Sequence, residues 1–479
     1  MRHVLLAVAV ALATPAWAQP SLQGQVEAVL AEAPRGTRWG LLVMDEDGRE
    51  LVAINPDARF IPASNTKLFT TAAAFATLPD LDRPDAAGGA SVRLEGGRVP
   101  DVILRGHGDA RLSGAADCVA NCLAALADAV AARTRVVRNV IGDDSLFPDQ
   151  RWSPGMSWNN MPSAFGTAVS ALTLDDNQLA VVVRPTLAGR PPGIESSPYY
   201  AVDNRALTVA GGPTDLAFER LPGSTRVRVT GTIAAGAEPS TLRLGIHDPA
   251  HFAAWRLKAM LEARGVRVMG EVAAQHRPAT SADDPRLRSG APPARPPEPS
   301  ALARLVPPPL RDDLRLINKA SQNLHAELML RRIGRAAGTG SIADGLAAVD
   351  AVAARAGVPR SGWDLSDGSG LSTYNRLAPR AVVALLRWAA AQPWAEAWRE
   401  TLPVAGVDGT LARRFHGTAL QGRLRAKTGS LNATNGLSGY LTARSGRTLT
   451  FSFFANDVPE GGSATRWMDA ALLAIAEAN

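Results

Sequence analysis

The sequence predicts an α+β protein in which one antiparallel sheet, covered by helices, is interrupted by a large inserted region. Residues 37–44 and 50–54 have the pattern of a β-hairpin around the Gly48 turn, and the chain ends in a strand, strand, helix pattern. Between about residues 81 and 279, short strand-like segments alternate with glycine-rich turns instead. We therefore expect the two ends of the chain to pair into one sheet around an insertion.

The first 18 residues have the pattern of a secretory signal peptide. A basic start precedes an apolar run, residues 4–13, that is too short to span a bilayer, and Ala16-Trp17-Ala18 is a small-x-small cleavage site. We expect cleavage after Ala18 rather than an uncleaved anchor, and no later membrane span. The protein is then exported, to the periplasm or the cell envelope.

The remaining elements follow in order. A helix is predicted from about Ser64 to Leu78. The insertion, residues 81–279, is one region or two sub-domains, and ten prolines between Pro278 and Pro309 predict a semi-rigid or disordered linker at 280–304. The other expected elements are strands at 102–104, 136–141, 179–183, 227–233, 424–428, 436–443 and 448–455, and helices at 312–335, 342–356 and 463–478. The sheet-and-helix domain therefore spans 19–80 and 305–479.

Charge and ligand patterns exclude several classes of function. The 51 basic and 45 acidic residues give a formal net charge of +6 without any long basic block, so no nucleic-acid surface is expected. Seven dispersed histidines give no ligand pattern, and neither a metal nor another cofactor is expected. Cys118 and Cys122 lie in an alanine-rich stretch, residues 117–132, with helical patterning. Export favours a local disulfide between them over two buried thiols.

Lysine is rare in this chain, and its positions are informative. Only four of the 51 basic residues are lysine and the other 47 are arginine. Arginine keeps its proton in a protein, whereas lysine can lose it where its surroundings lower its pKa. Three of the four, Lys67, Lys319 and Lys427, lie in or beside short serine motifs. These positions indicate chemistry that needs a neutral amine or a compact ammonium.

The first motif, Ser64-Asn65-Thr66-Lys67, stands at the start of the predicted helix. A spacing of three puts both side chains on one helical face, and the helix dipole stabilises an oxyanion that forms beside the serine. Lys67 can accept the proton of Ser64 only when it is neutral, a form that burial and a neighbouring ammonium, such as Lys427, favour. The alternative is a helix-capping serine with an ordinary surface lysine.

The second motif, Ser321-Gln322-Asn323, follows Lys319. A hydroxyl at Ser321 can pass a proton to a leaving amine, and the amide of Asn323 can bind a peptide backbone through its donor and its acceptor. Taken alone, serine and asparagine near a helix start are more typical of helix caps.

The third motif, Lys427-Thr428-Gly429-Ser430, lies on a predicted edge strand. An ammonium and a hydroxyl together bind a terminal carboxylate, and Gly429 allows a ligand to approach the backbone. The Ser430 amide would complete an oxyanion hole with the Ser64 amide. The alternative for this motif is a turn beside a strand.

In this order the three motifs are the signature of penicillin-recognising serine enzymes. The mature chain resembles the exported D-alanyl-D-alanine carboxypeptidase/endopeptidase family, the low-molecular-mass class C penicillin-binding proteins. The matching segments are Pro62–Leu68, Gly142–Phe147, Asp367–Ser372 and Asn375-Arg376. The 254 residues from Lys67 to Ser321 match the long insertion of this family, which forms two extra domains there, whereas class A β-lactamases place these motifs far closer.

The resemblance implies a penicillin-binding/β-lactamase-like transpeptidase domain and a role for each motif residue. Ser64 would attack the carbonyl between two D-alanines, with Lys67 as general base and Ser321 as proton relay. Asn323 would hold the substrate backbone, and Lys427, Thr428, Gly429 and Ser430 would surround its terminal carboxylate. The implied partners are peptidoglycan stem peptides and cross-links, together with β-lactams that acylate Ser64.

Three departures from the family accompany the resemblance. Gln322 stands where the family usually has Asp, His107 and Ala110 are atypical in a glycine-rich segment, and the proline-rich stretch is an extra insertion. Two alternatives remain open: a β-lactamase or esterase on the same fold, and a non-catalytic peptidoglycan-binding protein.

Overall fold

The computed structural model describes residues 21–295 and 297–479, so the expected signal peptide lies outside the described residues. The two ends of the described chain form one five-stranded sheet with the order β19-β20-β21-β1-β2, in which every neighbouring pair is antiparallel. Its strands are β1 (Arg38–Met44), β2 (Glu50–Ile54), β19 (Leu424–Leu431), β20 (Thr434–Thr442) and β21 (Thr448–Asn456). The expected pairing of the opening hairpin with the closing strands is confirmed, and β19 is an edge strand as predicted.

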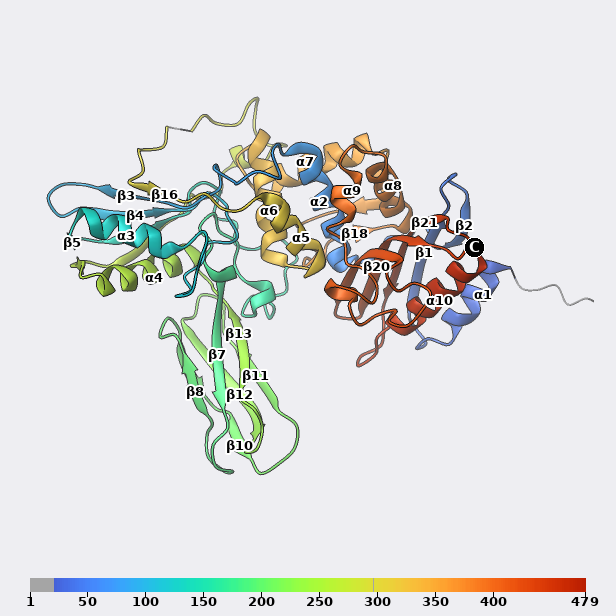
Figure 1. Cartoon of the computed structure of the whole chain (residues 1–479), viewed down its shortest axis with the longest axis horizontal. Helices are drawn as coiled ribbons and strands as arrows, with labels where there is room; N and C mark the ends of the chain where they lie inside the picture. Colours follow the sequence, from blue (N-terminus) through green and yellow to red (C-terminus); the bar gives the residue numbers. More distant parts are fainter. Residues whose placement is uncertain (1–20, 296) are drawn as a thin grey trace, which may run out of the picture.

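Helices cover both faces of this sheet (Figure 1). Phe453 and Phe454 are neighbours on β21, and their side chains join different hydrophobic clusters because successive strand residues point to opposite faces. The cluster with Phe453 includes α1 (Leu22–Ala31) and α10 (Thr465–Ala478). The cluster with Phe454 includes α2 (Thr66–Thr77), α5 (Leu310–Lys319), α6 (Asn323–Ala337), α7 (Ile342–Arg355), α8 (Pro379–Ala390) and α9 (Ala395–Arg399).

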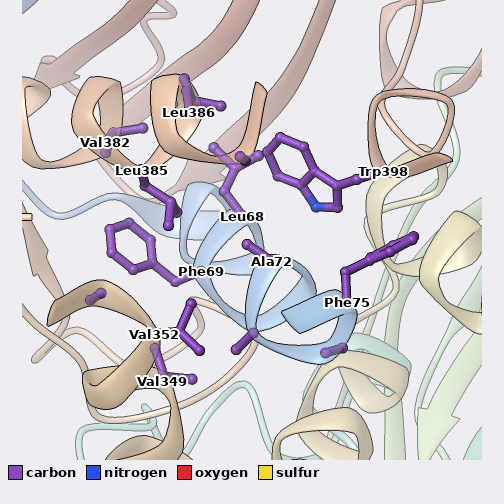
Figure 2. Close-up of a cluster of buried hydrophobic side chains, with 14 of the residues drawn as sticks. Leu68, Phe69, Ala72, Phe75, Val349, Val352, Val382, Leu385, Leu386 and Trp398 are labelled. Atoms are coloured by element: carbon purple, nitrogen blue, oxygen red, sulfur yellow. The ribbon is translucent and has the colours of Figure 1, made fainter. Parts of the chain in front are cut away.

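Helix α2 runs through the centre of the second cluster. Every residue from 66 to 75 is buried, and Figure 2 shows apolar side chains of α2 surrounded by those of α7, α8 and Trp398 of α9. Five of the twelve residues of α2 are threonine or lysine, so this helix buries polar as well as apolar side chains in the core. The position of α2 explains the burial of Lys67, which stands on its first turn.

The region between β2 and α5 contains two further bodies of sheet. One is a five-stranded mixed sheet with the order β15-β6-β4-β3-β16, packed against α3 (Leu123–Arg133) and α4 (Pro249–Ala263). Its strands are β3 (Ser91–Glu95), β4 (Asp101–Arg105), β6 (Val140–Asp143), β15 (Val272–Gln275) and β16 (Ala303–Arg304), and β5 (Val136–Val137) pairs with β14 (Arg267–Val268) beside it.

The other body is an elongated set of strands that projects from the molecule (Figure 1), and we call it the β-finger. It contains β7 (Gln178–Arg184), β8 (Gly193–Ser196), β9 (Ala201–Asn204), β10 (Leu207–Val209), β11 (Asp215–Glu219), β12 (Arg226–Ala234) and β13 (Ser240–Gly245). We propose that the mixed-sheet body and the β-finger are the two sub-domains of the insertion.

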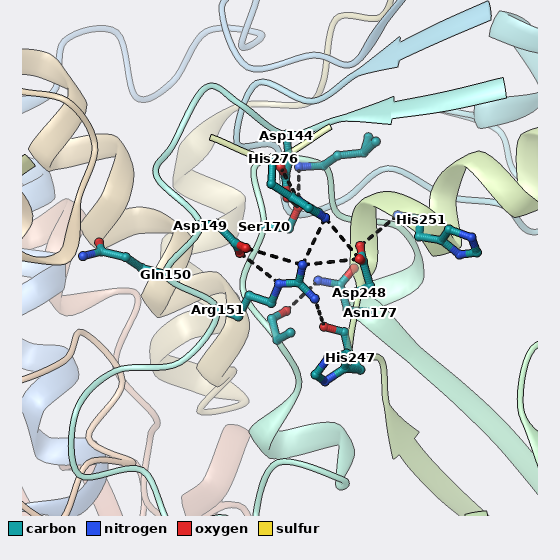
Figure 3. A network of polar contacts seen from close by, with 12 residues as sticks. Asp144, Asp149, Gln150, Arg151, Ser170, Asn177, His247, Asp248, His251 and His276 are labelled. Atoms are coloured by element: carbon teal, nitrogen blue, oxygen red, sulfur yellow. Dashed lines mark hydrogen bonds and ion pairs between the residues drawn. The ribbon is translucent and has the colours of Figure 1, made fainter. Parts of the chain in front are cut away.

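A charged network lies in the insertion, next to a segment that contacts the helical domain (Figure 3). Arg151 donates to Asp248 at 3.3 Å, and His276 lies 2.9 Å from Asp144 and 3.1 Å from Asp248. Hydrogen bonds to these two carboxylates raise the pKa of His276 to about 10, so the histidine is charged at neutral pH. The adjacent Gln150 accepts hydrogen bonds from α6 and α7 through its backbone and side-chain oxygens.

One expectation about the cysteine segment needs correction and the other is confirmed. The helix expected over 117–132 begins only at Leu123, because Asn121 takes a left-handed conformation at φ 57° and residues 113 and 122 form a β-bridge. The favoured disulfide between Cys118 and Cys122 is confirmed, in the turn before this helix.

The proline-rich segment is anchored along its described residues rather than free. Arg288 pairs with Asp344 of α7 at 2.6 Å, Glu298 lies 2.8 Å from His107, and β16 pairs with β3. Among residues 21–295 and 297–479, no helix combines the length and hydropathy that crossing a membrane requires.

Candidate active site

Ser64 lies in a short 3₁₀ turn, Ala63–Asn65, that leads directly into α2. Ala63 has φ 47°, an unfavourable conformation held by tight packing around the turn. Gly370 approaches so closely that a Cβ there would lie 1.9 Å from the Ala63 carbonyl oxygen, and its φ of +89° itself favours glycine. A Cβ at Gly429 would similarly lie 2.7 Å from the Pro62 carbonyl oxygen. The close contacts of Gly370 and Gly429 with the backbone before Ser64 therefore hold the turn that carries Ser64 in place.

Lys67 is fully buried directly below Ser64. Its Nζ donates to Ser64 Oγ at 2.9 Å, to Asn323 Oδ1 at 2.6 Å and to the Ser369 carbonyl oxygen at 2.6 Å. Lys67 and Asn323 are 256 residues apart in sequence, so the first and second motifs meet at the amine of Lys67.

Burial lowers the pKa of Lys67 from 10.5 to about 7, because a buried ammonium loses its hydration. The carboxylates of Asp367 and Glu327 act in the opposite direction. We expected the ammonium of Lys427 to lower the pKa of Lys67, but the repulsion between the two lysines acts on the pKa of Lys427 instead. Burial, followed by repulsion from Lys67, lowers the pKa of Lys427 well below its ordinary value.

Ser321 stands at a break between two helices. The single helix expected over 312–335 is wrong: α5 ends at Lys319, Ser321 has φ 60°, and α6 begins at Asn323. This break turns the Ser321 hydroxyl toward Lys427, whose Nζ donates to Ser321 Oγ and to the Thr428 carbonyl oxygen, both at 2.9 Å. Asn323 also donates Nδ2 to the Phe165 carbonyl oxygen at 2.9 Å, so its side chain links Lys67 to the insertion.

The edge strand β19 forms the opposite wall. Thr428 and Ser430 line the cleft, as alternate residues of a strand point the same way, while Lys427 and Gly429 are buried. Thr428 Oγ1 lies 2.7 Å from the hydroxyl of Thr410, and Ser430 Oγ accepts a hydrogen bond from Asn435 at 3.3 Å.

Two buried carboxylates support the floor of the site. Glu327 accepts hydrogen bonds from the backbone of Gly368 and Ser369 at 3.0 and 2.9 Å, and pairs with the buried Arg331 at 3.1 Å. Asp367 accepts from the backbone of residues 370 and 372, and burial together with repulsion from Glu327 raises its pKa to about 6. The carboxylates therefore hold the loop whose Ser369 carbonyl binds Lys67.

Sequence reasoning missed three groups in this site. The Ser369 carbonyl belongs to the backbone and leaves no trace in the side-chain pattern. Thr410 lies in a short 3₁₀ turn, Gly409–Leu411, which is too short to show a periodicity. Glu327 had a usable signal, because it is an acidic residue four positions after Asn323, in the middle of a helix with an apolar face.

The sequence did not predict the contacts that two other motif residues make. Lys319 pairs with Asp408 at 2.5 Å, away from Ser321, and fastens α5 to the loop that carries Thr410. Gln322 donates to Asp176 of the insertion at 3.2 Å. An aspartate in place of Gln322 would face that carboxylate.

The motif residues surround a cleft of about 850 Å³. Its lining includes Ser64, Ser321, Asn323, Thr428 and Ser430, together with the half-exposed ring of Phe165. This volume suits a small peptide or a drug-sized ligand.

Comparisons with known proteins agree with this geometry. A model of the D-Ala-D-Ala carboxypeptidase 3 (S13) family matches residues 22–478. The D-alanyl-D-alanine carboxypeptidase of Actinomadura sp. (strain R39) is 34% identical over 496 residues, covering 97% of this chain and 87% of that protein. The D-alanyl-D-alanine carboxypeptidase DacB of Haemophilus influenzae is 24% identical over 446 residues, covering 89% of this chain and 87% of that protein.

A solved structure has the same fold. The crystal structure of penicillin binding protein 4 (dacB) from Haemophilus influenzae superimposes with a TM-score of 0.77 at 22% identity, covering 94% of this chain and 97% of that chain. This likeness confirms the predicted fold class. Given the match over residues 22–478 and the Actinomadura relative, the chain belongs to the D-Ala-D-Ala carboxypeptidase 3 (S13) family of serine peptidases.

Proposed function

We propose that Ser64 is the nucleophile of a D-Ala-D-Ala carboxypeptidase that acts on peptidoglycan stem peptides through an acyl-enzyme. One observation carries the proposal: the fully buried Lys67, with a pKa near 7, donates to Ser64 Oγ at 2.9 Å. An amine with such a pKa is substantially neutral at neutral pH and can take the serine proton. The pattern of residues 1–18 supports export to the periplasm or cell envelope, where this substrate lies.

In the acylation step, Ser64 Oγ attacks the carbonyl carbon of the scissile bond while its proton moves to Lys67 Nζ. Backbone N–H groups of Ser64 and Ser430 serve as the oxyanion hole in this proposal. The carbon–nitrogen bond then breaks, and the departing amine takes its proton from Ser321 Oγ. Lys67 returns its proton to this relay, and water later hydrolyses the ester.

The substrate's ends are held on the two walls of the cleft. Asn323 and the edge strand bind the peptide backbone on the acyl side. The terminal carboxylate sits against Thr428, Ser430 and Lys427, where its negative charge raises the lowered pKa of Lys427 and favours the ammonium. Thr410, 2.7 Å from Thr428, fixes the orientation of that hydroxyl.

The test is covalent labelling of the mature protein with a fluorescent penicillin, beside a Ser64→Ala variant. We expect a stable labelled band that is absent in the variant, and release of D-alanine from a pentapeptide ending in D-Ala-D-Ala. A band of equal strength in Ser64→Ala contradicts the assignment of the nucleophile. Rapid consumption of the penicillin without a stable band indicates a β-lactamase, and an unreactive protein with intact penicillin indicates a non-catalytic binding protein.

A further inference from the structure

A separate cavity, of about 420 Å³, lies where the β-finger meets α4 of the mixed-sheet body. Its walls come from residues 198–200 and 223–225, which precede β9 and β12, and from residues of the segment 247–255 around the start of α4. The described residues around this cavity are all different from those that line the catalytic cleft. The volume falls in the range of small-ligand sites, ~300–1,000 Å³. The cavity is therefore a candidate binding site that the proposed reaction at Ser64 does not use.

Aromatic rings form one wall of this cavity. Tyr199 and Trp255 are partly exposed, with their ring centroids 5.5 Å apart and their planes at 61°. The buried Phe252 contacts both rings, at 6.2 Å from Trp255 with planes 16° apart and at 4.9 Å from Tyr199. The electron-rich faces of such rings attract C–H groups that carry a small positive charge. The cavity thus offers a ligand an aromatic surface that is supported by the core.

Polar groups of the wall have free hydrogen-bonding capacity. The Tyr199 hydroxyl lies 3.1 Å from His251 Nδ1 and 3.4 Å from the carbonyl oxygen of Asp248. His251 Nε2 and the imidazole of His247 make no hydrogen bond with any described residue, and neither does the exposed hydroxyl of Thr225. Figure 3 shows the ring of His251 directed away from the charged network. These groups can bind the hydroxyl or carbonyl groups of a ligand.

The charge in the cavity wall is already compensated. Apart from the histidines, Asp248 is the only acidic or basic side chain among the described residues of the wall. Its carboxylate accepts from Arg151 at 3.3 Å and lies 3.1 Å from His276 Nε2. Burial, followed by repulsion from Arg151 and Arg220, lowers the pKa of His247, so its imidazole is neutral at neutral pH. A wall without an unpaired arginine, lysine or carboxylate among its described residues favours an uncharged ligand over an acidic peptide.

A sugar ring has the chemistry that complements this wall. A pyranose presents a face of C–H groups to an aromatic surface and a rim of hydroxyl groups to hydrogen-bonding side chains. An N-acetyl group adds a neutral amide and a methyl group. The glycan strand of peptidoglycan consists of such rings, whereas its stem peptides end in carboxylates.

One segment of the insertion connects this cavity to the catalytic cleft. The ring of His247 packs against Trp152, with centroids 5.4 Å apart. Trp152 Nε1 donates to the carbonyl oxygen of Gly166 at 2.9 Å, and the adjacent Phe165 lines the cleft. A ligand beside His247 is therefore bound by a part of the insertion that packs against a wall of the cleft.

We propose that this cavity binds an N-acetylated sugar of the glycan strand and so anchors the polymer that carries the stem peptides. Trp255 and Tyr199 contact the ring, and His251 and Thr225 bind its hydroxyl or acetyl groups. The identification of the sugar with the peptidoglycan strand rests on the proposed function, whereas the site itself uses no residue of the catalytic cleft.

The test is isothermal titration calorimetry of the mature protein with a soluble tetramer of N-acetylglucosamine, with circular dichroism of each variant to show that it is folded. We expect saturable binding to wild type and a Kd about tenfold higher in Trp255→Leu, which keeps an apolar side chain but removes the ring. Tyr199→Phe keeps the ring, removes the hydroxyl beside His251 and should raise the Kd about threefold. The matched control, expected to bind as wild type does, is Trp388→Leu, at a partly exposed tryptophan of α8 that packs beside Trp394 and lines neither the cavity nor the cleft.

The outcomes separate the sugar site from the proposed function. No saturable binding up to about 10 mM tetramer overturns the site, as does an equal Kd in wild type, Trp255→Leu and Tyr199→Phe. Loss of tetramer binding in Ser64→Ala places the sugar in the catalytic cleft and overturns the assignment to this cavity. Binding of a free stem tetrapeptide in place of the tetramer, lost in Trp255→Leu, overturns it in favour of a peptide site. A protein that binds the tetramer as expected but neither labels with penicillin nor releases D-alanine retains the sugar site and overturns the proposed function, together with the identification of the strand.

Discussion

The assignment of Lys67 as general base predicts the pH dependence of acylation. At pH 7, a pKa of about 7 leaves about half of Lys67 as free amine, against about three molecules in ten thousand at the ordinary pKa of 10.5. Burial therefore raises the population of the reactive form by about a thousandfold. The sign follows directly: a base works in its neutral form, so the rate rises with pH through about 7 and falls about tenfold per unit below pH 6.

The matching variant is Lys67→Arg, because a guanidinium keeps its proton at every accessible pH. We expect the acylation rate to fall by about a hundredfold to ten-thousandfold, the usual contribution of a general base. The control is Lys258→Arg, which makes the same exchange at a partly exposed lysine of α4 that pairs with Glu262.

The assay is the time course of fluorescent penicillin labelling from pH 5 to 9, with circular dichroism of each variant to show that it is folded. A rate that does not change with pH over this range, or that still rises about tenfold per unit between pH 8 and 9, contradicts the lowered pKa of Lys67. Acylation at the wild-type rate in a folded Lys67→Arg variant refutes its role as the base.

Two further substitutions test the support of the site. Glu327→Gln leaves the buried guanidinium of Arg331 without its carboxylate, so the free energy of unfolding should fall by about 3 kcal/mol in urea denaturation, and a loss below about 1 kcal/mol argues against this pairing. Gly370→Ala should abolish penicillin labelling, since its Cβ would overlap the carbonyl before Ser64, whereas Gly446→Ala, with a similar φ of +91° and open space around it, should lose only about 1 kcal/mol of stability and label normally.

The sequence by itself determined the sheet, the edge strand and the identity of the motif residues. Apolar segments beside the glycine turns in residues 37–54 and 424–455 predicted strands that the structure pairs, and β20 and β21 are buried on both faces because helices cover the sheet on each side. The scarcity of lysine singled out Lys67, Lys319 and Lys427. The structure places Lys67 beside Ser64 and Lys427 beside Ser321, whereas Lys319 pairs with Asp408. Local helix patterning was less reliable: it ran through Ser321, where a left-handed residue ends one helix before the next begins.

Tertiary structure alone decided how the site works. The lowered pKa of Lys67 comes from the packing of α2 inside the helical core, which no local pattern records. The Ser369 carbonyl and Thr410 reach the site from loops remote in sequence, through backbone geometry and single hydroxyl contacts. A cavity of about 990 Å³ forms where the insertion meets α5 and α6, because a wall shared by several parts of the chain is a property of their arrangement and not of any one segment.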